Sequence, residues 1–295
     1  MNTYSLCMAA AEGDIEQIRN LISLGFNVNQ TDKYNDTPII LAAEYGHFEI
    51  VDELLKNNAD PNHFKSGTSA IFAAVNEGYA DITELLLKNS ADPNLCGPKN
   101  IPPILKATFK GLHNIIELLL NHDADPNIII DDTGACALIA SIVKSDIKSC
   151  EMLLDGKADP NIITTTGMTP LITSILSNNL KMEMSKLLVK YNADVNLQGK
   201  NGWAPILYAS QIGAANIVSF LIENDADANI KTKDGRTALI ETVSWGNKET
   251  AVVLLDAGVD IDAEDDYGRT AVSIAQSLGK DDILELFSLQ RKSKT

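Results

Sequence analysis

The four-residue stretch Ala59-Asp60-Pro61-Asn62 recurs along the chain and decides its fold. The recurrences end at Asn29, Asn62, Asn94, Asn127, Asn161, Asn196, Asn229 and Asp262, in steps of 33, 32, 33, 34, 35, 33 and 33 residues. Self-similarity at such a period is typical of repeat proteins, in which each unit buries its apolar face against its neighbours.

A second phrase, Thr37-Pro38-Ile39, keeps step with the first, and nine positions after its start comes Gly46. Thr can cap a helix through its hydroxyl group, and Pro suits the first helical position. Glycine ends such a helix because it tolerates a positive φ. Ile50, Val51, Leu54 and Leu55 then follow at helical spacing. Each repeat is therefore predicted to hold two short helices, an exit turn and a finger loop.

This pattern resembles the ankyrin repeat family, whose signature is a unit of ~33 residues with a Thr-Pro-Leu-His-x-Ala core. The resemblance covers essentially the whole chain, although Ile40, Phe72 and their equivalents replace the signature His. It implies an all-α ankyrin-repeat solenoid of stacked helix-turn-helix units with finger loops. We expect one domain, 1–295, with nine repeats at about 1–29, 30–62, 63–94, 95–127, 128–161, 162–196, 197–229, 230–262 and 263–295.

The middle of the chain departs from the regular pattern. Ser145 and Asn178 replace the helix-ending glycine, one extra residue precedes Cys136, and two extra residues lie near 178–180. One interpretation is drift, which loops tolerate. The other is a change in the curvature of the stack that suits a partner.

Composition limits the classes of function. A formal net charge of −16 argues against nucleic acid as a partner, since phosphate binding needs a basic surface. Much of this charge belongs to the exit turns, although an acidic face that recruits a basic partner stays open. No apolar run suits a membrane span, and four cysteines without close pairing favour free thiols in a reducing, cytoplasmic compartment.

The sequence contains no pattern that indicates catalysis. His113 and His122 lie nine residues apart and lack the four-residue spacing of a helical zinc pair. Phosphate-binding glycine loops and a nucleophile elbow are absent from the sequence. We therefore expect no enzyme activity, no metal site and no cofactor.

Repeat proteins bind partners through the concave groove and the loops that border it. Side chains are candidates where the repeat pattern does not call for an apolar or aromatic residue, because such residues resemble binding hot spots. The candidates are Tyr45, Phe64, Phe109, Ile129, Ile163, Trp203, Tyr208 and Trp245. The opposite interpretation, that these side chains fold back into the stack, applies above all to Trp203.

The predicted function is a protein–protein interaction module, either an adaptor, a scaffold or an inhibitor, that acts as a monomer on another protein. The alternative is a bacterial effector that is secreted into the host cytosol and binds a host protein. The resemblance also implies that exit-turn asparagines can be hydroxylated where Leu stands eight residues earlier and Asp two earlier. The asparagines that fit are Asn62, Asn94, Asn127, Asn161, Asn196 and Asn229. The competing interpretation is that they only build the turn.

Overall fold

A computed structural model describes residues 5–64, 67–130, 133–177 and 181–293. Within these ranges the fold is all-α, as predicted, with eighteen α-helices and no β-strand beyond three isolated bridges in the fingers. By its contacts the chain divides into two compact units, Met1–Ala158 and Asp159–Thr295. The prediction of a single domain stays a prediction.

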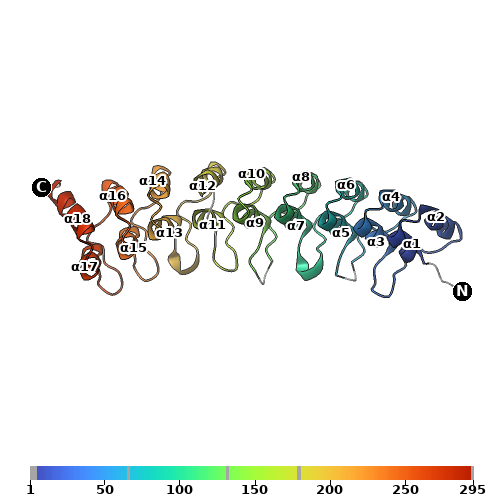
Figure 1. The fold of residues 1–295 in the computed structure, drawn as a ribbon, viewed down its shortest axis with the longest axis horizontal. Helices are drawn as coiled ribbons and strands as arrows, with labels where there is room; N and C mark the ends of the chain where they lie inside the picture. The colour runs from blue at the N-terminus through green and yellow to red at the C-terminus, as the bar shows by residue number, and fades with distance from the viewer. Residues whose placement is uncertain (1–4, 65–66, 131–132, 178–180, 294–295) are drawn as a thin grey trace. The chain divides into compact units, whose positions relative to one another are not determined.

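Unit 1 contains five helix pairs (Figure 1). The helices are α1 (Leu6–Glu12), α2 (Ile15–Ser23), α3 (Pro38–Tyr45), α4 (Phe48–Lys56), α5 (Ala70–Glu77), α6 (Ala80–Lys88), α7 (Pro103–Lys110), α8 (His113–Asn121), α9 (Ala137–Val143) and α10 (Ile147–Asp155), with a 3-10 turn η1 (Pro98–Asn100) in one finger. Within this unit the odd-numbered, first helices contact one another in sequence, and so do the even-numbered, second helices.

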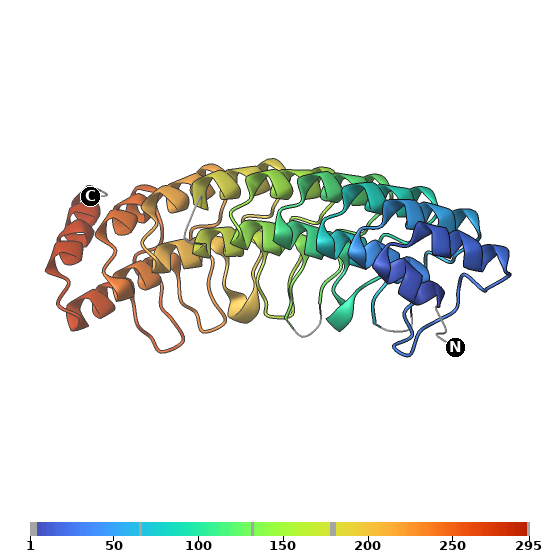
Figure 2. The same cartoon turned by 45° about the vertical axis from the view of Figure 1, so that its right-hand side comes forward.

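Unit 2 contains four further pairs. The helices are α11 (Pro170–Leu176), α12 (Lys181–Lys190), α13 (Pro205–Gln211), α14 (Ala215–Glu223), α15 (Ala238–Trp245), α16 (Lys248–Asp256), α17 (Ala271–Ser277) and α18 (Asp281–Ser293), with a 3-10 turn η2 (Lys200–Gly202). Within each unit the first helices form one layer and the second helices another, and the fingers extend from the side of the first helices (Figure 2).

The first helices supply much of the core. In α5 every residue from Ala70 to Val75 is buried, whereas α6 buries only one face, through side chains such as Ile82 and Leu86. Small residues such as Ala42, Ala43 and Ala74 let adjacent first helices approach closely. Burial of these apolar side chains between repeats is the main stabilising contribution in the array.

The prediction that a threonine hydroxyl caps the first helix is confirmed in some repeats and wrong in one. Thr169, Thr237 and Thr270 accept a hydrogen bond from the third residue of their helices, as expected. Thr37 makes no such bond, and its buried hydroxyl oxygen has no partner among the described residues. Pro38 and apolar packing of α3 therefore hold this helix start without the side-chain cap.

The glycine positions at the ends of first helices require the left-handed region. Gly46 and Gly78 have φ values of 79° and 88°. Ser145, which replaces glycine in repeat five, adopts a φ of 56°, a conformation that costs a non-glycine residue about 1–2 kcal/mol. The backbone therefore keeps the same exit here despite the substitution. The other irregularity, at 178–180, lies outside the described residues.

The exit-turn asparagines connect each repeat to the next. The side-chain amide of the asparagine donates to the carbonyl of the second residue after the following second helix, and this acceptor residue has a positive φ in every case. In unit 1 the pairs are Asn29–Asn58, Asn62–Ser90, Asn94–Asp123 and Asn127–Lys157. In unit 2 they are Asn161–Asn192 and Asn196–Asp225. We call this series the exit-turn ladder.

Candidate protein-binding surface

The ends of the first helices differ between the two units. In unit 1 the equivalent positions are the exposed residues Tyr45, Glu77, Lys110 and Lys144. In unit 2 three of them are exposed apolar residues at the ends of successive first helices, namely Ile212, Trp245 and Leu278. Because α13 contacts α15 and α15 contacts α17, these three positions form a row along the layer. We call it the apolar row.

Trp245 is the largest side chain of the apolar row and is 63% exposed at the end of α15. An exposed tryptophan beside other exposed apolar side chains is typical of a binding surface, because such a patch gains most from being covered. Its exposure leaves the ring free for contact, and its role as a contact residue stays a prediction.

Trp203 and Tyr208 form a half-buried aromatic pair in unit 2. Their ring centroids are 4.8 Å apart at an interplanar angle of 42°. Burial raises the pKa of the Tyr208 hydroxyl above its ordinary value. Trp203 follows the η2 turn and Tyr208 lies on α13, so each ring holds the other at the base of the finger. Both rings keep part of their surface open, as contact residues need.

The unit 1 candidates divide into exposed and half-buried side chains. Tyr45, Phe64 and Phe109 are exposed, and Ile129 is half-buried in its finger. Lys144 places its ammonium group 4.4 Å from the centroid of the Phe109 ring, a favourable cation–π contact. Ile163, in the first finger of unit 2, is also exposed. Exposed finger and helix-end side chains of this kind offer contacts without a cost to the core.

Sequence reasoning missed a hollow of about 510 Å³ on the finger side of unit 1. Its lining residues are Tyr34, Asp36, Glu44, Thr68, Phe72, Ala73, Asn76 and Pro98. Phe72 stands where the family signature has His, and a Cβ atom at Gly97 would lie 2.2 Å from its ring. The co-occurrence of Phe72 and Gly97 was a signal in the sequence that Phe72 lies against the next finger.

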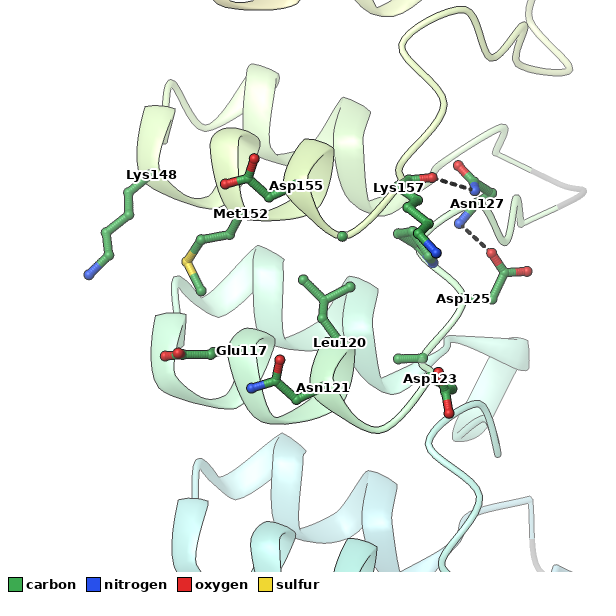
Figure 3. Close-up of a pocket in the computed structure, with 13 residues that line it drawn as sticks. Glu117, Leu120, Asn121, Asp123, Asp125, Asn127, Lys148, Met152, Asp155 and Lys157 are labelled. Carbon is green, nitrogen blue, oxygen red and sulfur yellow. Dashed lines mark hydrogen bonds between the residues drawn. The ribbon is translucent and has the colours of Figure 1, made fainter. Parts of the chain in front are cut away.

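A second hollow, of about 740 Å³, lies between α8 and α10 (Figure 3). Leu120 and Met152 form its apolar part, while Glu117, Asp155 and Lys148 lie around them. It is open and carries charges of both signs, so it presents no single chemical preference. The figure also shows the Asn127–Lys157 bond of the exit-turn ladder at its edge, 3.2 Å long.

The exit-turn asparagines are all placed on turns at repeat boundaries. The Asn62 side chain accepts from the Asp92 amide at 2.7 Å, and the same contact recurs from Asn94 to Asp125 and from Asn161 to Asp194. The asparagine therefore has a role between repeats as well as within its own turn.

In the described ranges, no group of three or more His, Cys, Asp or Glu side chains is arranged to hold a metal ion. Nor does any helix in the described part of the chain have the length and apolar character needed to cross a membrane.

A family model for ankyrin repeats, in three copies, matches residues 6–97, 149–232 and 209–294, which together exceed half of the chain. The ankyrin repeat-containing protein YIL001W of Saccharomyces cerevisiae is 40% identical over 58 residues, which are 20% of this chain and only 11% of that protein. The Notch-regulated ankyrin repeat-containing protein of Xenopus tropicalis is 33% identical over 85 residues, or 28% of this chain and 73% of that one.

Among solved structures, the human ASB11 ankyrin repeat domain is similar to this chain with a TM-score of 0.56. The match covers 68% of this chain and 89% of that domain at 24% sequence identity. At this identity the likeness concerns the fold alone, and it agrees with the paired helices and fingers described above.

Proposed function

Because this chain belongs to the ankyrin repeat family, we propose that it is a non-catalytic module that binds a protein partner through its fingers and the exposed ends of its first helices. Ankyrin repeats are in general protein-interaction modules. The observation that carries the proposal for this chain is the apolar row, where Trp245 and its neighbours leave apolar surface uncovered. Tyr208 lies on a helix of the same layer, and its contact with Trp203 at the base of the finger extends the proposed contact surface.

We propose that the protein is a monomer in the cytoplasm. An adaptor, a scaffold and an inhibitor would each use the same binding surface. All four cysteines are free thiols, as a reducing compartment would keep them. The identity of the protein partner, once it is captured, shows which of these three roles applies. A translocation assay with a reporter fused to the chain separates these uses from that of a secreted effector.

The test captures partners from the native cell and compares variants against the partner recovered. Tyr208→Ala with Trp245→Ala is expected to weaken binding more than tenfold, since aromatic hot spots commonly contribute over ~2 kcal/mol. The single variant Trp245→Ala is included because this side chain is largely exposed, so its loss should weaken binding without a folding defect. Val252→Ala with Leu289→Ala is the matched control, as both remove exposed apolar surface from second helices. Unchanged affinity of the aromatic variants would overturn this surface.

Hydroxylation of the exit-turn asparagines is a separate proposal. It rests on Leu54 and Asp60, which stand eight and two residues before Asn62, and on the same spacing in later repeats. Intact-mass measurement after expression in animal cells should show one or more added oxygen atoms. An unmodified mass would mean that these asparagines serve the turn and the ladder only.

A further inference from the structure

The hollow on the finger side of unit 1, introduced above, has an apolar floor. Phe72 and Ala73 of α5 are each only 6% exposed and supply this floor. Tyr34, from one finger, is mostly exposed, and Asn76 also lines the hollow. A long side chain with methylene groups could lie on this floor and place its end group at the rim.

The rim is negatively charged. Asp36 and Glu44 line the hollow, and Glu77 lies close enough to act electrostatically on Glu44. Burial, and then the charges of Asp36 and Glu77, raise the pKa of the Glu44 carboxyl group above its ordinary value. In the described ranges, no Lys, Arg or His forms an ion pair with any of these three carboxylates.

Two nearby lysines contact lining residues of the hollow without pairing with its carboxylates. The ammonium group of Lys33 lies 4.7 Å from the centroid of the Tyr34 ring, and Lys110 donates to the carbonyl oxygen of Asn76. One carboxylate oxygen of Asp36 is buried without a hydrogen-bond partner among the described residues. The rim therefore carries like charges that repel one another, and the hollow would gain from a bound cation.

We propose that this hollow receives an arginine side chain from the bound partner. The assignment rests on the proposed function, since the arginine belongs to the segment that the protein binds. Arginine fits better than lysine because its planar guanidinium group can bond two carboxylates at once, packs against aromatic rings and is weakly hydrated. Its aliphatic stem matches the floor of Phe72 and Ala73. The carboxylates at this hollow thereby select one class of partner, a segment with an arginine side chain.

The experiment uses the full chain, isotope-labelled, and end-blocked tripeptides as probes. Ala-Arg-Ala should shift the amide signals of Phe72, Ala73 and Asn76 with a dissociation constant on the order of 1 mM. The same peptide with citrulline, which has the shape of arginine without its charge, should cause no such shift. Shifts from citrulline equal to those from arginine, equal binding of Ala-Lys-Ala, or no shift with Ala-Arg-Ala would each overturn the proposal.

Two double variants test whether the tripeptide binds in the hollow. Asp36→Asn with Glu44→Gln should weaken Ala-Arg-Ala binding about fivefold or more. Glu49→Gln with Asp256→Asn changes the net charge equally at exposed positions outside the hollow and should leave binding unchanged. Equal losses in both double variants would indicate a non-specific charge effect and overturn the proposal.

The two proposals can fail separately. The tripeptide needs no partner protein, so the arginine site can fail while the apolar row still binds a partner. Conversely, the aromatic variants of unit 2 can leave partner affinity unchanged while the tripeptide still binds. The proposed partner-binding surface would then be wrong, and the proposed arginine site would stand.

Discussion

The side chain of Asn62 accepts a hydrogen bond from the backbone amide of Asp92 at 2.7 Å, across the boundary between two repeats. The same side chain donates to the Ser90 carbonyl at 2.9 Å. One amide group thus satisfies a donor and an acceptor of the next exit turn. This relationship explains why asparagine, with both functions on one short side chain, recurs at the end of the motif.

Replacement of Asn62 by Ala should lower the free energy of unfolding by about 1–2 kcal/mol, because two hydrogen bonds between repeats are lost. Urea unfolding followed by circular dichroism measures this change. Asn121→Ala, at an exposed position on α8, is the control and should have a much smaller effect. Equal effects at the two positions would mean that the ladder adds nothing to stability.

The buried ion pair of Arg236 and Glu241 provides a second prediction. Glu241 is 2% exposed, and Arg236 also donates to the Ser244 hydroxyl oxygen at 3.0 Å. Arg236→Ala should destabilise the protein by about 3 kcal/mol, since it leaves a carboxylate buried without its cation. Arg236→Met with Glu241→Leu should cost less than that single change. A double variant less stable than Arg236→Ala would contradict this explanation.

Replacing Glu44 by Gln should increase stability in a way that depends on pH. Its pKa is raised in the folded state, so the folded protein holds this proton more tightly than the unfolded chain does. The resulting penalty is absent below the unfolded pKa and develops as pH rises through the folded pKa. Glu44→Gln should therefore raise the unfolding midpoint at about pH 7 and lose that advantage near pH 3.5.

Glu49→Gln serves as the control for Glu44→Gln, because it removes a carboxylate from an exposed position on α4. It should not reproduce the difference between the two pH values. An advantage of Glu44→Gln that persists unchanged at the lower pH would show that the charge of Glu44 is not its cause.

Thiol reactivity should separate Cys96 from the other cysteines. Burial raises the pKa of Cys7 to about 11 and that of Cys150 to about 12, and it also raises the pKa of buried Cys136. Burial raises the pKa of Cys96 as well, but this thiol is only half-buried and so is open to a reagent. At about pH 8 an aromatic disulfide reagent should therefore modify Cys96 first and the other three slowly, at the rate of local opening. Cys96→Ser should remove the fast phase, and a fast phase that remains would contradict the burial of the others.

The sequence predicted the paired helices because a 33-residue spacing is visible wherever Asn62 and its equivalents occur. It also placed Tyr45, Phe109 and Trp245 correctly at exposed helix ends, since these positions follow from the period alone. The depth of Trp203 was harder to predict, because it depends on contact with Tyr208 rather than on position in the repeat.

The hollow in unit 1 could not be predicted, because Tyr34, Glu44, Phe72 and Pro98 belong to separate segments that only the stacking brings together. The failed cap at Thr37 has a similar cause. Local propensity favours the bond, whereas the packing of α3 determines where the hydroxyl lies.

The exit-turn ladder also bears on how such a chain can change in length during evolution. The donor and acceptor residues are 28 apart in the Asn62–Ser90 pair and 31 apart in the Asn161–Asn192 pair, yet both bonds form. An insertion between two rungs is absorbed by the finger or the helix turn and is not passed on to later repeats. Register is thus renewed at each asparagine, so individual fingers are free to diversify in length and sequence while the rest of the array keeps its spacing.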